Sequence, residues 1–199
     1  YHLKHHRFTE TEDDPDLVLS APFPINKKSF FRKVIRDLTG ITGYKRYSSS
    51  LISIFQTEAD SFPDKVIRIW NKIHGFLIVN FIVFILISIF FHWSLFFLLW
   101  WLPAFTYYSL IIRIRNIAEH CVTPGESDFD KTRTTKASLI IRFLLAPHRV
   151  NYHLEHHLFM MCPWYNLPKA HLMMLENGYK DKMCLENSYR SVLSKAVSA

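Results

Sequence analysis

Residues 75–112 read GFLIVNFIVFILISIFFHWSLFFLLWWLPAFTYYSLII and contain no Asp, Glu, Lys or Arg. A single straight helix of this length would measure about 57 Å, whereas the hydrocarbon core of a bilayer is about 30 Å thick. The stretch is too long for one membrane span and suits two. We expect spans over about 73–91 and 95–112, joined by a turn at His92-Trp93-Ser94, with a kink at Pro103 in the second span. The alternative is a buried hairpin in a large soluble core.

Basic residues stand on both sides of this hairpin and none stands in its turn. Lys65, Arg68 and Lys72 precede it, and Arg113 and Arg115 follow it. Because Lys and Arg favour the cytoplasmic side of a membrane, we expect both ends of the hairpin there. The predicted fold is an all-α integral membrane protein forming one domain over residues 1–199. In it, about 1–72 and 113–199 are cytoplasmic and about 73–112 form the transmembrane hairpin.

Composition limits the remaining choices. Hydrophobic residues make up 49% of the chain, and 17 Phe stand against only 5 Gly, which excludes a disordered or collagen-like protein. The net charge of +7 is explained by Lys and Arg near anionic lipid, so we expect a bilayer partner and no nucleic acid. Three widely spaced Cys indicate neither a disulfide framework nor a thiolate zinc site. Amphipathic patterns over residues 29–38 and 64–73 predict two short helices at a membrane interface, the first ended by Gly40 and Gly43.

Histidines cluster in two copies of the pattern H-x-x-H-H, one on each side of the hairpin. On a helix, offsets of three and four residues place the imidazoles of one copy on one face. Converging imidazole nitrogens suit a first-row transition metal. The hairpin returns the chain to its starting side, so the two copies can meet. The candidate ligands in them are His2, His5, His6, His153, His156 and His157.

A third element follows the second span, where Asn116 and His120 lie four residues apart. His120 is a candidate seventh imidazole, and Asn116 could bind metal directly or through water. Seven His are too many for one zinc ion, and a two-metal, imidazole-rich site beside a membrane suits iron and dioxygen chemistry. Nearby carboxylates could orient the imidazole N–H groups, with Arg149 and Asn151 in similar roles. These carboxylates are Asp13, Asp14, Asp16, Glu119 and Glu155.

These motifs resemble the membrane fatty acid desaturase and hydroxylase superfamily, whose mark is three histidine boxes. The second box resembles HLKHH at 2–6 together with DPD at 14–16. The third box resembles NYHLEHHLF at 151–159 together with PWYNLP at 163–168. Asn116-x-x-x-His120 is similar to the extra ligand helix of acyl desaturases, and the runs at 132–135 and 146–149 are similar to bacterial desaturases, including the rhizobitoxine-type branch. The first box has no counterpart here, so we expect a C-terminal part of a longer desaturase, inactive alone.

The resemblance implies an oxidoreductase of lipid metabolism with two iron ions and O2 as co-substrate. It implies that the seven histidines bind iron, that Asn116 acts through a water, and that a C=C bond is introduced into an acyl chain. The substrate would be an acyl-lipid or an acyl chain on a carrier. No haem or flavin domain is recognised, so the electron donor would be a separate protein of ferredoxin or cytochrome type.

Two other functions remain open from the sequence. The first is a carotenoid ketolase or hydroxylase, or another di-iron lipid hydroxylase of the same superfamily. The carotenoid enzymes share the boxes and the DPD sequel, although Asn116-x-x-x-His120 argues against them. A membrane protein that binds or senses metal without catalysis is the second. Of the other histidines, His74 and His171 are assigned to structural or interface contacts and His92 to the turn, and His148 is left unassigned.

Overall fold

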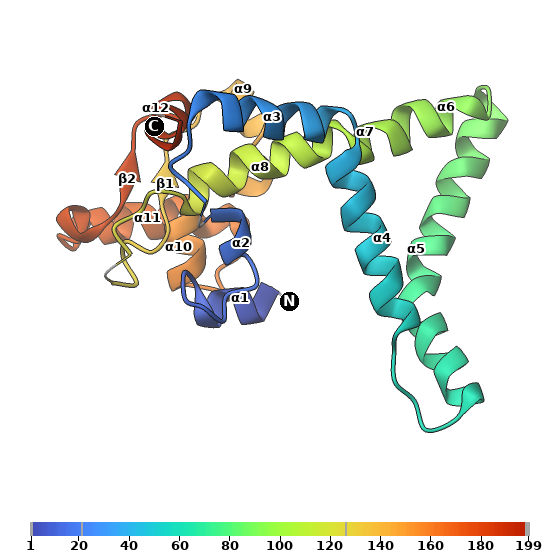
Figure 1. The fold of residues 1–199 in the computed structure, drawn as a ribbon. Helices are drawn as coiled ribbons and strands as arrows, with labels where there is room; N and C mark the ends of the chain where they lie inside the picture. The colour runs from blue at the N-terminus through green and yellow to red at the C-terminus, as the bar shows by residue number, and fades with distance from the viewer. Residues whose placement is uncertain (1, 21, 126, 198–199) are drawn as a thin grey trace. The chain divides into compact units, whose positions relative to one another are not determined.

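The computed structural model describes residues 2–20, 22–125 and 127–197, and most of them are helical (Figure 1). The chain divides into two compact units, residues 1–31 with 111–199, called here the histidine unit, and residues 32–110, called the hairpin unit. Helices α3 (Lys27–Leu38) and α8 (Tyr107–His120) run from one unit into the other. The hairpin unit also holds α4 (Ile41–Phe55), α5 (Phe62–Phe90), α6 (Ser94–Phe96), the π-helix η1 (Phe97–Trp101) and α7 (Leu102–Phe105).

Two helical segments are long and apolar enough to cross a membrane. They cover Phe62–Phe90 and Ser94–His120. The most apolar window is 0% buried in the first and 17% buried in the second, so neither is a core helix of this fold. The helices break at residues 91–93, where the sequence predicts the turn. The prediction of two apolar spans is confirmed at the level of helices, although both are longer than expected.

The two apolar helices pair side by side within the hairpin unit. The indole Nε1 of Trp100 donates to Oδ1 of Asn80 at 3.1 Å, and the rings of Phe84 and Phe96 meet edge to face with centroids 5.4 Å apart. An amide and an indole N–H that face lipid would lack a partner, so their mutual bond stabilises the pairing.

Pro103 distorts the second apolar helix as expected. Proline has no N–H to donate and clashes with the preceding turn, and a π-helix is one way to absorb this. The π-helix η1 lies directly before Pro103, and the helix is interrupted again at Thr106, whose φ and ψ are −102° and −86°. The hydroxyl of Thr106 donates to the carbonyl of Leu102 at 2.7 Å.

The segment before the hairpin departs from the sequence prediction in two ways. The amphipathic stretch 64–73 is not a separate interfacial helix, because it is the first part of α5, which Ser61 caps by accepting from the N–H of Asp64. Gly43 does not end a helix but lies inside α4, where a Cβ would stand 2.3 Å from the carbonyl oxygen of Phe105. Glycine is required there by the close approach of α4 to α7. The helix predicted over 29–38 is confirmed as α3.

The histidine unit is built from short elements. They are α1 (His2–Phe8), α2 (Leu17–Ser20), β1 (Thr134–Thr135), α9 (Leu139–Leu144), η2 (Pro147–Arg149), α10 (His153–Leu158), η3 (Trp164–Asn166), α11 (Leu167–Glu176), η4 (Lys180–Lys182), β2 (Leu185–Glu186) and α12 (Tyr189–Ala196). β1 and β2 pair in parallel, with Thr134 opposite Leu185, and Thr134 also bridges to Tyr152. The prediction of a helical chain is confirmed in the main, and these two-residue strands are the exception.

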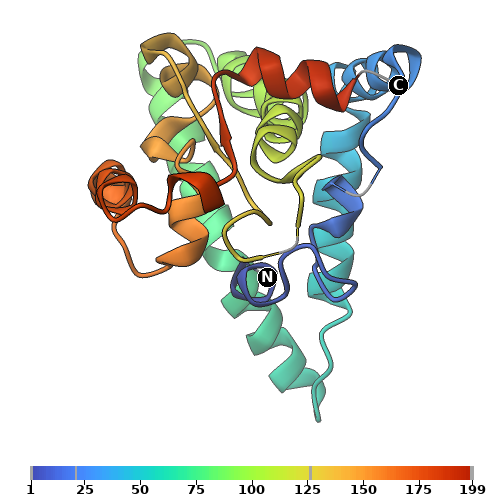
Figure 2. The ribbon, with the colours of Figure 1, turned by 90° about the vertical axis from the view of Figure 1, so that its left-hand side faces the viewer.

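Small hydrophobic clusters hold the histidine-bearing helices in place. Helix α12 lies beside the end of α8 (Figure 2). Ile117 and Cys121, near the end of α8, pack in one cluster with Val192 and Ala196 of α12. Leu154 of α10 is fully buried in a second cluster with α11. These contacts fix the end of α8 and one side of α10, so the imidazoles on both helices have defined positions.

Candidate metal centre

Three helices bring histidines from distant parts of the sequence to one place in the histidine unit. α1 carries His2, His5 and His6, and α10 carries the second set. His120 is the last residue of α8. The seven imidazoles fall into two groups in which every ligand nitrogen lies within 4.8 Å of the others. The first group is His5, His120, His153 and His157, and the second is His2, His6 and His156.

The nitrogens within each group face one another closely. In the first group, Nε2 of His153 lies 2.9 Å from Nε2 of His120 and 3.1 Å from Nε2 of His157. In the second group, the three Nε2 atoms form a triangle with sides of 3.0, 3.1 and 3.2 Å. Hydrogen bonds cannot satisfy all three sides of this triangle. Each neutral Nε2 carries either an N–H or a lone pair, so at least two of the three atoms are both donors or both acceptors.

A metal ion resolves this arrangement. Nitrogens bound at about 2.1 Å and at right angles lie about 3.0 Å apart, close to the distances in both groups. The donor set is all imidazole, which suits iron, zinc or copper and disfavours magnesium and calcium. The residues present therefore fit two transition-metal ions, one held by four histidines and one by three.

Hydrogen bonds to the far nitrogens set the orientation of two rings. His5 is buried, and its Nδ1–H donates to Oδ1 of Asp14 at 2.8 Å, which leaves Nε2 for the metal side. The hydroxyl of Thr9 donates to the carbonyl of His5 at 2.8 Å, so its oxygen accepts from Nδ1–H of His157 at 3.2 Å. We assign both tautomers from these bonds. Thr9 was not singled out by the sequence reasoning.

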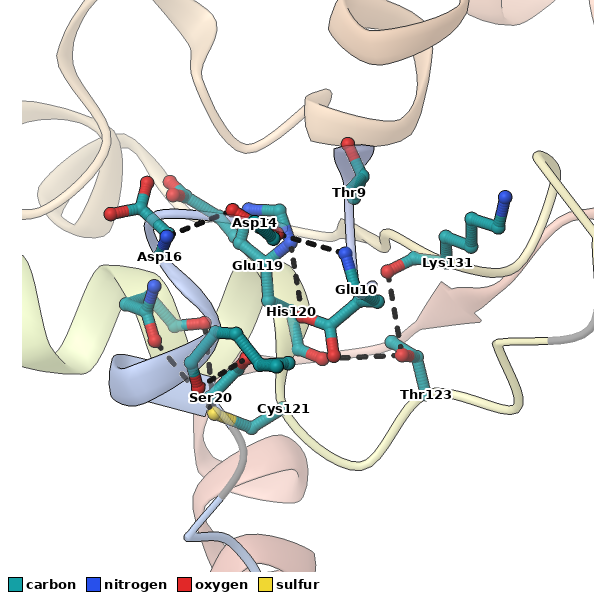
Figure 3. A network of polar contacts seen from close by, with 12 residues as sticks. Thr9, Glu10, Asp14, Asp16, Ser20, Glu119, His120, Cys121, Thr123 and Lys131 are labelled. Carbon is teal, nitrogen blue, oxygen red and sulfur yellow. Dashed lines mark hydrogen bonds and ion pairs between the residues drawn. The ribbon is translucent and has the colours of Figure 1, made fainter. Parts of the chain in front are cut away.

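Two further carboxylates approach the first group. Oε2 of Glu119 lies 3.9 Å from Nδ1 of His153, and Glu119 is itself held by Nε of Arg115 at 3.1 Å. Glu10, another residue that the sequence reasoning missed, places Oε1 3.8 Å from Nδ1 of His120 (Figure 3). Its position four residues after His6, at the start of the acidic segment, is the signal that could have identified it.

Asp14 organises the acidic segment that follows α1. Its Oδ2 accepts from the backbone N–H of Glu10 and its Oδ1 from that of Asp16, both at 2.8 Å (Figure 3). Burial acts to raise the pKa of Asp14, but the bonds from His5 and from these two N–H groups bring the pKa below its usual value. The carboxylate is therefore ionised and stabilises positive charge at the metal site. Asp13, by contrast, is exposed.

Burial favours the neutral form of several histidines in the two groups. It lowers the pKa of His6 to about 4, with the neighbouring His156 and His2 contributing. The pKa of His153 is lowered well below its usual value by burial and by His157, and burial also lowers the pKa of His157. Neutral imidazole is the form that binds metal, so the site is prepared for cations.

Two other sequence candidates have partners outside the seven imidazoles. Asn116 lies four residues before His120 on α8, and the Sγ–H of Cys121 donates to its Oδ1 at 3.9 Å. Glu155 is fully buried and turns away from the imidazoles, since it accepts from the hydroxyl of Thr134 and from Nδ1–H of His171 at 2.6 Å. His171 thus holds Glu155, which stands in the sequence between the ligand candidates His153 and His156.

Comparison with protein families agrees with this geometry. The family model described as "Fatty acid desaturase" matches residues 1–184. The chain therefore belongs to the fatty acid desaturase family. Searches among curated proteins and among solved structures each returned no match.

Proposed function

We propose that this protein is an O2-dependent di-iron desaturase that introduces a C=C bond into the acyl chain of a lipid. The observation that carries the proposal is the division of seven imidazoles into one group of four and one of three. Membership of the fatty acid desaturase family and the two apolar helices support a lipid-modifying oxidoreductase. Iron is favoured over zinc because the reaction class requires a redox-active metal.

The iron ions, when bound, would supply the redox chemistry in which a –CH2–CH2– unit loses two hydrogens while O2, two external electrons and two protons yield two waters. The residues of this chain have other tasks. Asp14 and Thr9 fix the tautomers of His5 and His157 so that Nε2 faces the metal. Burial of His153 and Glu155 excludes water from one side of the centre.

The proposal includes an orientation and a set of partners. Basic residues flank the uncharged stretch 75–112 on both sides, so the histidine boxes would lie on the cytoplasmic side. These residues are Lys65, Arg68, Lys72, Arg113 and Arg115. A separate ferredoxin-type or cytochrome-type protein would deliver electrons, and the substrate would be an acyl-lipid or carrier-bound acyl chain. Labelling Ser94→Cys should require a reagent on the opposite side of the membrane, and labelling from the cytoplasm would contradict the orientation.

Iron content and lipid products test the function together. In the protein expressed from its natural gene, His157→Ala should lose iron from the group of four, His156→Ala should lose iron from the group of three, and both should lose desaturated product. His92→Ala is the matched control, because His92 is exposed and bonds to Ser94 in the turn. It should keep both. Oxygenated carotenoid in place of unsaturated acyl chains, or bound iron without O2 consumption, would overturn the assignment.

A further inference from the structure

Helix α9 exposes an apolar face that the histidine unit does not cover. Four apolar side chains of the helix are more than half exposed: Leu139 (76%), Ile140 (70%), Phe143 (83%) and Leu144 (54%). At 100° per residue these four side chains form one continuous face of the helix. The opposite face is packed, because Ile141 and Leu145 meet α8 residues and others in a buried cluster. A six-residue helix is too short to span a bilayer and suits its surface.

The helix that α9 packs against points to lipid as the covering partner. Ile141 of α9 and Leu145 directly after it share a hydrophobic cluster with Ile114 and Ala118, which lie in the last turns of the second apolar segment, Ser94–His120. When that segment spans a bilayer, an apolar face beside its end would lie at the boundary between headgroups and acyl chains. A soluble partner protein would have to displace that lipid.

A basic cavity adjoins the same helix. It has a volume of about 640 Å³, and Lys136, Arg142 and Lys180 line it. Among the described residues, none of these three side chains forms an ion pair. The carboxylate in the lining, Glu186, is bound by Lys195 and Ser191. The cavity thus presents uncompensated positive charge.

Two buried polar atoms in the lining also lack partners among the described residues. They are Nε of Arg142 and Oδ1 of Asn151, and the Asn151 side chain is more than nine-tenths buried. A buried donor and a buried acceptor without partners are costly unless a ligand or water satisfies them. Arg142 belongs to α9 itself, at the flank of the apolar face, so charge and apolar surface meet there.

The cavity is separate from the metal centre. None of the seven histidines in the two groups lines it. Thr134 and His171 line it, and these side chains hold the buried carboxylate of Glu155. A ligand in the cavity would therefore lie behind α10, apart from the facing imidazole nitrogens.

We propose that α9 and this cavity bind an anionic phospholipid, with the headgroup phosphate among Lys136, Arg142 and Lys180 and the acyl chains along the exposed face of α9. The apolar face supplies contact with the chains, and the cations supply attraction to the phosphate. The lipid would anchor the histidine unit at the membrane surface and satisfy the buried Arg142 Nε.

Retention of lipid by the purified full chain tests the headgroup part. The protein is reconstituted in mixed phosphatidylcholine and phosphatidylglycerol, and the lipid that stays bound after detergent exchange is measured by native mass spectrometry. We expect phosphatidylglycerol to be enriched, with about a fivefold loss for each cation replaced by Gln. The triple variant Lys136→Gln/Arg142→Gln/Lys180→Gln should lose about a hundredfold, the product of three such contributions.

A matched triple variant separates the cavity from general surface charge. Lys4→Gln/Lys169→Gln/Arg190→Gln removes the same charge from exposed positions outside the cavity, and it should keep the bound lipid. Equal losses in the two triple variants would overturn the proposal. Displacement of the lipid by inorganic phosphate alone would also overturn it, because the ligand would then be a free phosphate.

Depth-dependent quenching tests the apolar part and does not depend on the triple variants. With Cys162 and Cys184 changed to Ser, a fluorophore on Phe143→Cys should be quenched by lipids that carry a nitroxide near the headgroup. The same fluorophore on Asp128→Cys, in an exposed loop, should be quenched little. Equal quenching at the two positions would show that α9 does not enter the membrane surface.

Discussion

Asp14 is the carboxylate in closest contact with a histidine of the metal centre. Its Oδ1 lies 2.8 Å from Nδ1 of His5. Asp14→Asn replaces an ionised acceptor by a neutral amide, so we expect a 10- to 100-fold loss of metal affinity, about the effect of removing such outer partners elsewhere. Asp13→Asn changes the same charge at an exposed neighbour and should have little effect. Metal titration of the two variants distinguishes them, and equal affinities would remove Asp14 from the site.

Asn116 provides a second test at the residue scale. A neutral amide is a poor ligand beside imidazole but a good hydrogen-bond partner for a metal-bound water. We expect Asn116→Ala to keep most of the iron and lose most of the activity, whereas His120→Ala should lose iron from one position. If Asn116 only packs against Cys121, its loss should cost at most about 1–2 kcal/mol of stability and leave turnover normal.

Single residues differ in how well the sequence predicts their positions. The spacing within each histidine box is local, so one helical turn is enough to predict which imidazoles share a face. The roles of Thr9 and Glu10 depend on how α1 meets α10 and α8, and nothing in the local pattern reports that packing. Glu155 illustrates the same limit, since its partner His171 comes from α11.

At the scale of elements, the contact between α4 and α7 depends on one missing side chain. A Cβ on Gly43 would stand 2.3 Å from the Phe105 carbonyl oxygen, whereas one on Gly75 of α5 would meet nothing within 4 Å. We therefore expect Gly43→Ala to destabilise the protein by about 1–3 kcal/mol through overpacking. Gly75→Ala should stabilise its helix by up to about 1 kcal/mol. Thermal unfolding in detergent measures both, and shifts of the same sign would contradict this account.

Elements with a strong repeating pattern were predictable, and those held by distant contacts were not. The two apolar helices and α3 follow from length and periodicity alone. The strands β1 and β2 have two residues each and pair across about fifty positions of sequence, so no periodicity can identify them. α4 was missed because its mixed composition becomes intelligible only beside α7, where Gly43 allows close approach.

For the whole molecule, the convergence of the three histidine elements could be predicted because a hairpin returns the chain to its starting side. The division into groups of four and three could not, since it depends on which nitrogen each ring presents. That choice is made by Asp14 and Thr9 through the far nitrogens of His5 and His157. The metal centre is thus a property of the folded histidine unit and of the residues surrounding the boxes.

Acid should weaken the histidine unit before it affects the apolar helices. The pKa of His6 falls from 6.5 to about 4 in the folded state, and the pKa values of His2, His153, His156 and His157 are also lowered. Below pH 6.5 the unfolded chain therefore binds more protons than the folded chain, so stability falls as pH falls towards 4. Above pH 6.5 both forms are neutral and these groups add no pH dependence.

This pH dependence can be measured on chelator-treated protein, so that metal release does not contribute. Limited proteolysis between pH 7.5 and 4.5 should show earlier cleavage within residues 111–199 as the pH falls, because each protonated imidazole adds charge to a buried cluster. His6→Gln removes one of these groups and should flatten the profile between pH 6.5 and 4. An unchanged profile in that variant, or greater protection at low pH, would mean that the clustered imidazoles carry their protons in the folded state.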